Sequence, residues 1–229
     1  PVKELLAHPT CDVIVCGGGP AGVAAAVAAA SAGARTRLFE LRGCLGGVWT
    51  SGLLTILLDA AGPRSFLAEI VSELEALGGP LGHFQARDHG RMADFYYDPE
   101  DMKIVLERLC LRAGVEIQYH TRVCAAVVDN GRLTAVISES KSGRQAWPAA
   151  AFVDASGDGD LAAQAGCAFE YGRAGGQQAQ PLSMVAMVAG LDPAEVAAFT
   201  NGHPEYTDLQ TKQSFAAEQA KLGRDIYAP

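Results

Sequence analysis

A glycine-rich turn near the N-terminus constrains the fold more than any other part of the sequence. It reads Gly17-Gly-Gly-Pro-Ala-Gly22, follows the β-branched run Asp12–Cys16 and leads into an alanine-rich stretch. This order predicts a strand, a tight turn and a helix. The first, third and last glycines fill the positions of G-x-G-x-x-G, which allow the turn, the approach of a pyrophosphate and close packing of helix on strand. We therefore predict that a dinucleotide binds at the N-terminus of the helix.

A second strand supports this prediction. Thr36–Glu40 is a short β-prone run that ends in an acid eighteen residues after Gly22. The spacing is close to the ~20 residues expected for a carboxylate that accepts both ribose hydroxyls. The alternative is that Glu40 is an ordinary acid at the end of a strand. An acid here also disfavours a 2′-phosphorylated dinucleotide, because the two negative charges repel each other.

Composition narrows the class of protein. The chain has 229 residues, 49% of them hydrophobic and 19% charged, which is typical of a compact α/β protein with one large domain or a domain and part of a second. A net charge of −8 argues against nucleic acid as a partner. The longest apolar stretch is far shorter than the ~20 residues of a membrane span, and no secretory signal begins the chain, so we expect a cytoplasmic protein. The six cysteines lack the spacing of a metal or redox site, and we expect free thiols.

The segment after Glu40 separates two kinds of dinucleotide. Arg42–Gly52 carries the pair Gly46-Gly47 and small polar residues where an ordinary NAD domain would continue into a helix. Together with Glu40 it forms Glu-x-x-x-x-x-Gly-Gly, and in this it resembles the FAD-dependent oxidoreductase family of the glutathione-reductase-like FAD superfamily, related to fumarate reductase flavoproteins. The resemblance implies FAD as cofactor, with the Gly-Gly loop lying along the pyrophosphate and ribityl chain.

The resemblance extends over residues 11 to 56 and 94 to 192. Asp98-Pro99 predicts the start of a helix that runs to Gly114. Val115–Val123 is similar to the family's next strand, which implies backbone contact with adenine near its end. Ala151–Gly157 matches the family's "DATG" segment, which implies a strand that returns beside the ADP half of the cofactor.

Three short strands are predicted between these segments, at Cys124–Val128, Leu133–Ser138 and Arg144–Trp147, joined by glycine-containing turns. They indicate a β-meander. The acids Asp158 and Asp160 follow. They could hold a metal, but no further oxygen ligands appear at the expected spacing, and capping of a helix at 161–165 is the preferred interpretation.

Other parts are less informative. An amphipathic helix is predicted at about 64–77. The loop 78–94 contains His83, Arg87, His89 and Arg91, which could place cations near an anionic substrate or be surface residues. Gln180–Val188 resembles the family's entry into a substrate domain, and helices are predicted at 193–199 and 211–222.

These observations predict a doubly wound, Rossmann-like FAD-binding domain with a β-meander at residues 1–172, followed at 173–229 by the beginning of a truncated substrate domain. The expected function is transfer of hydride or electrons between FAD and an unidentified small molecule; the alternatives are a flavin monooxygenase or halogenase, and a non-catalytic dinucleotide-binding fragment. We expect the C-terminal remainder of the protein or a complementary chain to complete the site, and neither a metal nor a membrane to take part. No catalytic residue is assigned. The predicted cofactor-binding residues are Gly17, Gly19, Pro20, Ala21, Gly22, Glu40, Leu41, Arg42, Gly46, Gly47, Val48, Ser51, Val123, Ala155, Ser156 and Gly157.

Overall fold

The computed structural model describes residues 6–8, 10–58, 60, 66–78, 82–85 and 93–173, with positions 179, 183–185, 190, 192, 194–195 and 198 beyond them. The chain divides into two compact units, Pro1–Val185 and Ala186–Pro229. The predicted domain boundary near residue 172 stays a prediction.

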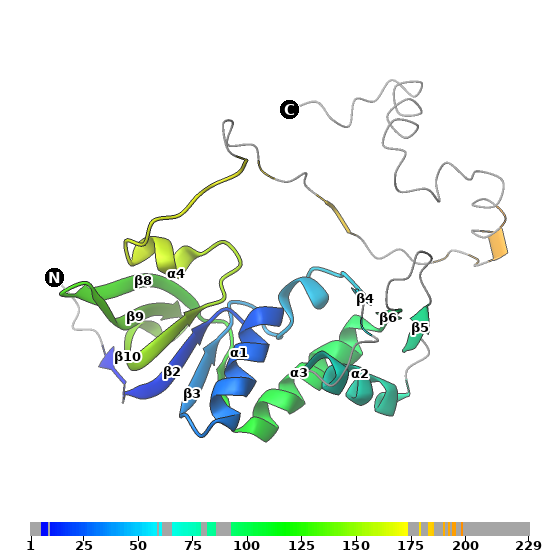
Figure 1. Ribbon diagram of the computed structural model, residues 1–229, viewed down its shortest axis with the longest axis horizontal. Coiled ribbons are helices and arrows are strands. Elements are labelled where there is room, and N and C mark those ends of the chain that lie inside the picture. The colour runs from blue at the N-terminus through cyan, green and yellow to red at the C-terminus, as the bar shows by residue number, and fades with distance from the viewer. Residues whose placement is uncertain are drawn as a thin grey trace. The chain divides into compact units, whose positions relative to one another are not determined.

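A mixed sheet with a parallel centre organises the first unit (Figure 1). Its strands run in the order β7-β3-β2-β10-β9-β8, with β1 beside β10, and a small separate sheet has the order β4-β6-β5. The strands are β1 (Leu6–Ala7), β2 (Cys11–Cys16), β3 (Thr36–Phe39), β4 (Ile56–Leu57), β5 (His83–Gln85), β6 (Asp94–Tyr96), β7 (Glu116–Gln118), β8 (Arg122–Asp129), β9 (Arg132–Ser140) and β10 (Gly143–Asp154). The helices are α1 (Pro20–Ser31), the 3-10 turn η1 (Gly47–Trp49), α2 (Phe66–Leu77), α3 (Pro99–Ala113) and α4 (Asp160–Gln164). This arrangement confirms the predicted α/β class with a Rossmann-like centre.

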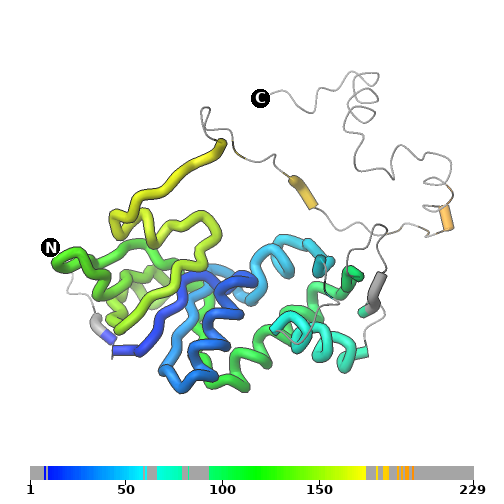
Figure 2. Tube along the Cα trace, in the orientation of Figure 1, coloured from blue at the N-terminus to red at the C-terminus, as the bar shows by residue number. Residues whose placement is uncertain are grey.

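Two hydrophobic clusters cover the two faces of the parallel strands. On one face α1 and α3 lie side by side, and α2 packs against α3 (Figure 2). On the other face the meander β8-β9-β10 packs through Val136 and Trp147 onto Ile14 and Phe39. Because both faces are buried, β2 is apolar along most of its length, as parallel central strands usually are.

The helix α3 follows its sequence signals. The Asp98 carboxylate accepts a hydrogen bond from the backbone N–H of Glu100 at 2.8 Å, Pro99 occupies the first turn, and Gly114 ends the helix with a φ of +84°. The predicted start and end are therefore confirmed. The helix α2 lies within the predicted 64–77 and is tied to α3 by Arg112, which donates to Glu69 and Glu73 at 2.7 Å each.

Two strand predictions were wrong. Val115–Val123 is not one strand but two, β7 and β8, because the chain turns at His120, whose φ is +51°. The backbone N–H groups of His120 and Thr121 donate to the backbone carbonyls of Arg42 and Glu40, respectively. The link between β7 and β8 is therefore hydrogen-bonded to the loop after β3. Conversely, the strand predicted at 144–147 and most of the strand predicted at 151–157 belong to one strand, β10, which ends at Asp154.

The continuity of β10 has a structural reason. Its first half pairs antiparallel with β9 up to Pro148, and its second half pairs parallel with β2 from Ala149 onward. Pro148 lacks an N–H donor, and it stands where the strand changes partner. The predicted meander turns are confirmed: Asn130 and Gly131 both have positive φ, as a type I′ hairpin requires.

Several sequence predictions lie outside the described residues. These are Arg87, His89 and Arg91, the helix at 211–222, and most of Gln180–Val188 and 193–199, whereas His83 lies in β5. None of the described helices combines the length and the apolar character needed to cross a bilayer.

Candidate dinucleotide-binding site

A cavity of about 740 Å³ lies at the carboxyl ends of β2, β3 and β10. In open α/β sheets this edge is where ligands bind, and the volume is within the range of small-molecule sites, roughly 300–1,000 Å³. Every predicted cofactor-binding residue except Gly22 and Gly46 lines the cavity. The structure thus brings these residues together, and their contact with a cofactor stays a prediction. The lining residues that the sequence did not identify are Cys16, Gly18, Phe39, Gly52, Thr121, Arg122, Asp154, Gly159, Asp160 and Leu161.

The three glycines of the turn differ in what surrounds them. A Cβ on Gly17 would lie 2.2 Å from the carbonyl oxygen of Ala155, and its φ is +107°; a Cβ on Gly22 would lie 1.8 Å from the carbonyl oxygen of Gly17. A Cβ on Gly19 would meet nothing within 4 Å. The outer two glycines are therefore required by packing, whereas the middle one borders open space where a ligand can approach the backbone.

The N-terminus of α1 borders the same space. The helix begins at Pro20 with Gly19 as its N-cap, and no side chain caps it. Its first intrahelical hydrogen bond runs from Val23 N–H to Gly19, and Ala21 lines the cavity. The unbonded first-turn N–H groups and the positive end of the helix dipole suit a phosphate.

The Glu40 carboxylate holds two backbone segments together at the end of β3. It is 7% exposed. Its Oε2 accepts from the N–H of Gly18 at 2.8 Å, and its Oε1 accepts from the N–H of Arg42 at 2.7 Å. A carboxylate has about four acceptor positions, so Glu40 can also accept ribose hydroxyls. It is thus more than an ordinary acid at the end of a strand, since it fixes the glycine turn against the loop that follows.

The Gly-Gly loop crosses the glycine turn at close range. A Cβ on Gly47 would lie 3.1 Å from the Cα of Gly19. Gly46 does not line the cavity. Its φ is +105°, and a Cβ there would lie 2.5 Å from the Thr50 side chain. Its N–H donates to the carbonyl of Gly18 at 2.8 Å. The two segments are therefore joined through their backbones.

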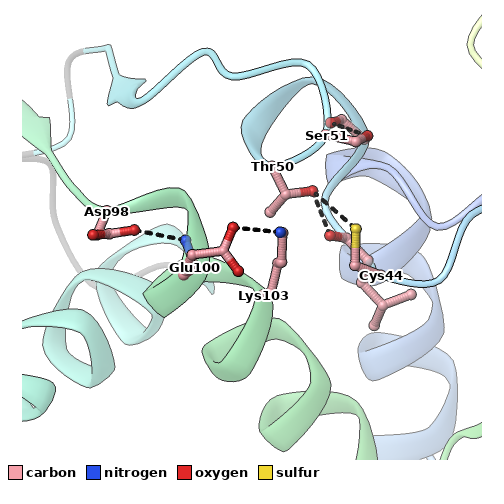
Figure 3. Close-up of polar contacts among 8 residues, drawn as sticks. Cys44, Thr50, Ser51, Asp98, Glu100 and Lys103 are labelled. Carbon is pink, nitrogen blue, oxygen red and sulfur yellow. Dashed lines mark hydrogen bonds and ion pairs between the residues drawn. The ribbon is translucent and has the colours of Figure 1, made fainter. Parts of the chain in front are cut away.

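Side-chain hydroxyls fix the loop itself (Figure 3). The Thr50 hydroxyl, fully buried, donates to the carbonyl of Leu45 at 2.6 Å, and the Ser51 hydroxyl donates to that of Gly47 at 3.1 Å. Cys44 Sγ lies 4.0 Å from the Thr50 hydroxyl, and the start of α3 nearby carries the pair Lys103–Glu100, 2.5 Å apart. The Thr50 and Ser51 bonds thus connect the loop to its own backbone beside the cavity.

Asp154, at the end of β10, is a lining residue that the sequence did not identify. Its Oδ1 accepts from the backbone N–H and the hydroxyl of Ser156 at 3.0 and 2.6 Å, and its Oδ2 accepts from the N–H of Ala162 at 2.8 Å. Burial raises the pKa of Asp154, but the hydrogen bonds from Ser156, Ala162 and Leu161 outweigh it and leave the pKa below its usual value. The carboxylate is therefore ionised near neutral pH.

These bonds correct the prediction that Asp158 or Asp160 caps the helix. The N-cap of α4 is Gly159, which has no side chain to do so. Asp154 accepts from the N–H of Ala162, and the Ser156 hydroxyl accepts from the N–H of Asp160 at 2.9 Å. The capping groups thus come from the end of the strand, which a search for acids just before the helix does not reach.

One cysteine lies at the cavity, and its thiol is protonated near neutral pH. Cys16 lines the cavity, but burial and then the charge of Asp154 raise the pKa of its thiol to about 12. All six cysteines are free thiols. Within the described ranges, no three His, Cys, Asp or Glu side chains are grouped so that they could hold a metal ion.

The cavity, the glycine turn and the acid at the end of β3 together define a dinucleotide-binding protein of the Rossmann class. The model of the FAD-dependent oxidoreductase family matches residues 12–227, so the chain belongs to this family, whose cofactor is FAD. The site fits that cofactor: Gly19 leaves room for a pyrophosphate, α1 presents free N–H groups, and Glu40 retains acceptor positions.

Individual relatives agree with the family. The chain is 31% identical to the thiamine thiazole synthase of Aeropyrum pernix over 136 residues, which cover 59% of this chain and 46% of that protein. The chain thus spans about half the length of this curated relative.

Solved structures agree on the fold alone. The aromatic hydroxylase CabE from angucycline biosynthesis has a TM-score of 0.53 and 20% identity, covering 69% of this chain and 33% of that one. THI4 of Thermovibrio ammonificans has a TM-score of 0.50 and 19% identity, covering 68% and 61%.

Proposed function

We propose that this chain is the FAD-binding part of an oxidoreductase that transfers hydride or electrons between FAD and a small-molecule substrate. The main support is the composition of the cavity lining. It includes Gly19, where an added Cβ would meet nothing within 4 Å, together with the N-terminus of α1 and Glu40. Bound FAD supplies a reversible two-electron carrier at its flavin ring. Family membership supports the reaction class, and the substrate follows from none of these residues.

Each part of the chain has a distinct task in this proposal. The turn at Gly19 and the start of α1 bind the pyrophosphate through backbone N–H groups. Glu40 accepts the ribose hydroxyls. Leu41 and Val48 line the cavity with 56% and 50% of their surfaces exposed, and these apolar groups cover bound rings and reduce their contact with water.

Two alternatives receive less support. A flavin monooxygenase or halogenase would have to activate oxygen and usually engage a nicotinamide partner, and no described residue favours that chemistry. A non-catalytic dinucleotide-binding module agrees with the cavity equally well, but less with membership of an enzyme family.

We also propose that the C-terminal remainder of the same protein or a complementary chain completes the active site. The described lining comes from the dinucleotide side, and the curated relative is about twice as long as the matched segment. The site then forms in the cytoplasm between these parts. Intact-mass analysis of the native protein tests this. A single 229-residue species with stoichiometric FAD and substrate turnover would contradict it.

The main experiment identifies the cofactor and then its chemistry. The protein is denatured, the released cofactor is identified by mass, and the holoprotein is mixed anaerobically with candidate donors while flavin absorbance is recorded. FAD that is bleached by one donor class supports the oxidoreductase. Release of NAD contradicts the cofactor assignment, and a protein that binds ADP but not FAD supports the non-catalytic module.

A further inference from the structure

Asp154 and Ser156 form a small hydrogen-bonded unit beside the dinucleotide cavity. The carboxylate accepts from both polar groups of Ser156 and from the N–H of Ala162, while the Ser156 hydroxyl accepts from the N–H of Asp160. Two side chains thus connect the end of β10 with the first turn of α4. Both line the cavity.

We propose that Asp154 and Ser156 are positioning residues for the dinucleotide: they hold segment 155–159 so that it supports the glycine turn from behind. The proposal rests on the proposed function, because it concerns how the same cavity binds the ADP half of FAD.

The direct contact lies between Ala155 and the turn. The Ala155 N–H donates to the carbonyl of Cys16 at 2.9 Å, and the Ala155 carbonyl oxygen lies 2.2 Å from the position that a Cβ on Gly17 would take. The next backbone nitrogen, of Ser156, is 3.0 Å from the same point. A shift of segment 155–156 therefore moves Gly17, and Gly17 in turn is in contact with Gly22 at the start of α1.

The segment has little else to fix its conformation. Gly157 and Gly159 have φ values of +97° and +74°, and a Cβ on either would meet nothing within 4 Å. Glycine has more backbone freedom than other residues, so two glycines close together make the segment easier to deform. One carboxylate connects the start of the segment to the helix that follows it, with Oδ1 toward Ser156 and Oδ2 toward Ala162 in α4. Loss of that connection should loosen the wall of the cavity while the sheet and α1 remain in place.

A purely structural role predicts something different. If the unit serves only to cap α4, removing a hydroxyl lowers stability and leaves the affinity of folded protein for the dinucleotide unchanged. If it positions the turn, affinity falls beyond any change in stability. Affinity of folded protein and stability of the ligand-free protein must therefore be measured on the same variants.

The test compares Ser156→Ala, Ser156→Thr and the matched control Ser140→Ala. The Ser140 hydroxyl likewise accepts from a backbone N–H, that of Ser142 at 3.2 Å, but Ser140 lies at the β9–β10 turn and does not line the cavity. Titration calorimetry gives the Kd for FAD and for ADP, and thermal unfolding gives the Tm of the ligand-free protein.

Positioning predicts that Ser156→Ala raises both Kd values by about 10-fold, as expected for loss of a hydrogen bond to a charged group. Its Tm should fall at least as far as that of Ser140→Ala, because the Ser156 hydroxyl also donates to Asp154. Ser156→Thr should restore affinity because it keeps the hydroxyl. Equal Kd values for Ser156→Ala and wild type, no recovery with Ser156→Thr, or a change for FAD but not for ADP would each overturn the proposal.

The outcome is separable from that of the proposed function. If the wild-type protein binds neither FAD nor ADP, the proposed function fails; if it binds both and Ser156→Ala binds equally well, only the positioning role fails. Should Ser156→Ala not fold, Asp154→Asn decides, because an amide places a donor where one backbone N–H now donates. A wild-type Kd in Asp154→Asn would then overturn the proposal.

Discussion

The strand β10 connects two regions that differ in packing: a cavity at its end and a filled aromatic cluster nearer its middle. At its end, where Asp154 pairs with Cys16, glycines and carboxylates leave a cavity open. Nearer its middle, just before Ala149 pairs with Cys11, aromatic rings fill the space. Trp147 stacks on His8 with ring centroids 3.5 Å apart and meets Phe39 edge-on at 5.2 Å.

The two regions also differ in how many of their polar groups have hydrogen-bond partners. Around the cavity, each oxygen of Glu40 and Asp154 accepts a backbone N–H. Around Trp147, the buried Nε2 of His8 and NH1 of Arg37 have no hydrogen-bond partner within the described ranges, and the Arg37 guanidinium lies over the indole ring at 4.5 Å. The carboxylates at the cavity edge thus have both oxygens engaged by backbone N–H groups, whereas the Trp147 region combines ring packing with one indole hydrogen bond, from Nε1 to the Ser138 hydroxyl at 2.7 Å.

The largest expected effect is a loss of stability, and it distinguishes a glycine required by packing from one that borders the cavity. Gly22→Ala should lower the free energy of unfolding by about 3 kcal/mol or more, because its Cβ would lie 1.8 Å from a backbone oxygen. Gly19→Ala, whose Cβ meets nothing within 4 Å, should change it by less than about 0.5 kcal/mol. Urea unfolding of both ligand-free variants measures the contrast, and equal losses would contradict it.

Gly19→Val tests the cavity itself. The variant should fold, since the position is open, yet lose FAD, since a branched side chain occupies the space that a pyrophosphate needs. The measurement is flavin content after purification, with circular dichroism as the check on folding. Folded Gly19→Val with the flavin content of wild type would show that the pyrophosphate lies elsewhere.

Glu40→Ala should have a smaller effect, on both FAD affinity and the stability of the ligand-free protein. Loss of the carboxylate should weaken FAD binding by about 1–3 kcal/mol, the scale of a charge-assisted hydrogen bond, and should also lower the Tm of the ligand-free protein because Gly18 and Arg42 lose an acceptor. Fluorescence titration and thermal unfolding separate the two contributions. An unchanged Kd for FAD would show that Glu40 only holds the backbone.

Local signals in the sequence were sufficient where structure depends on neighbouring residues. The glycine turn, the capped ends of α3 at Asp98 and Gly114, and the Asn130-Gly131 turn are each determined by backbone preferences within a few residues. Such preferences can be recognised without knowing what packs around them. The same holds for Glu40, because its distance from the turn reflects one helix and one strand.

Non-local pairing was not predictable in this way. That β10 continues through Pro148 depends on β9 and β2 both being available as partners. The role of Asp154 depends on the N–H groups of Ser156 and of Ala162, which lies eight positions further along the chain in α4. The sequence favoured Asp158 or Asp160 as the cap because these acids lie closer to that helix. His8 and Trp147 meet only because the N-terminal strand β1 pairs with β10.

The smallest expected effect concerns the Trp147 region and its pH dependence. Burial, and then the positive charge of Arg37, lower the pKa of His8 from its ordinary value of 6.5. The unfolded chain therefore binds a proton more readily than the folded one, so His8 contributes stability that is fully present above pH 6.5 and is lost as the pH falls toward the folded-state pKa. His8→Phe is the matched variant, since it keeps a ring that can stack on Trp147 but has no group to titrate. Urea unfolding at pH 7.5 and pH 5.5 should show a larger loss of stability for wild type than for His8→Phe, because all other titrating groups are shared. An equal loss in both proteins would mean that His8 titrates alike in the folded and unfolded chain. The contrast between hydrogen-bonded carboxylates at the cavity edge and an imidazole that protonates less readily between Trp147 and Arg37 would then no longer hold.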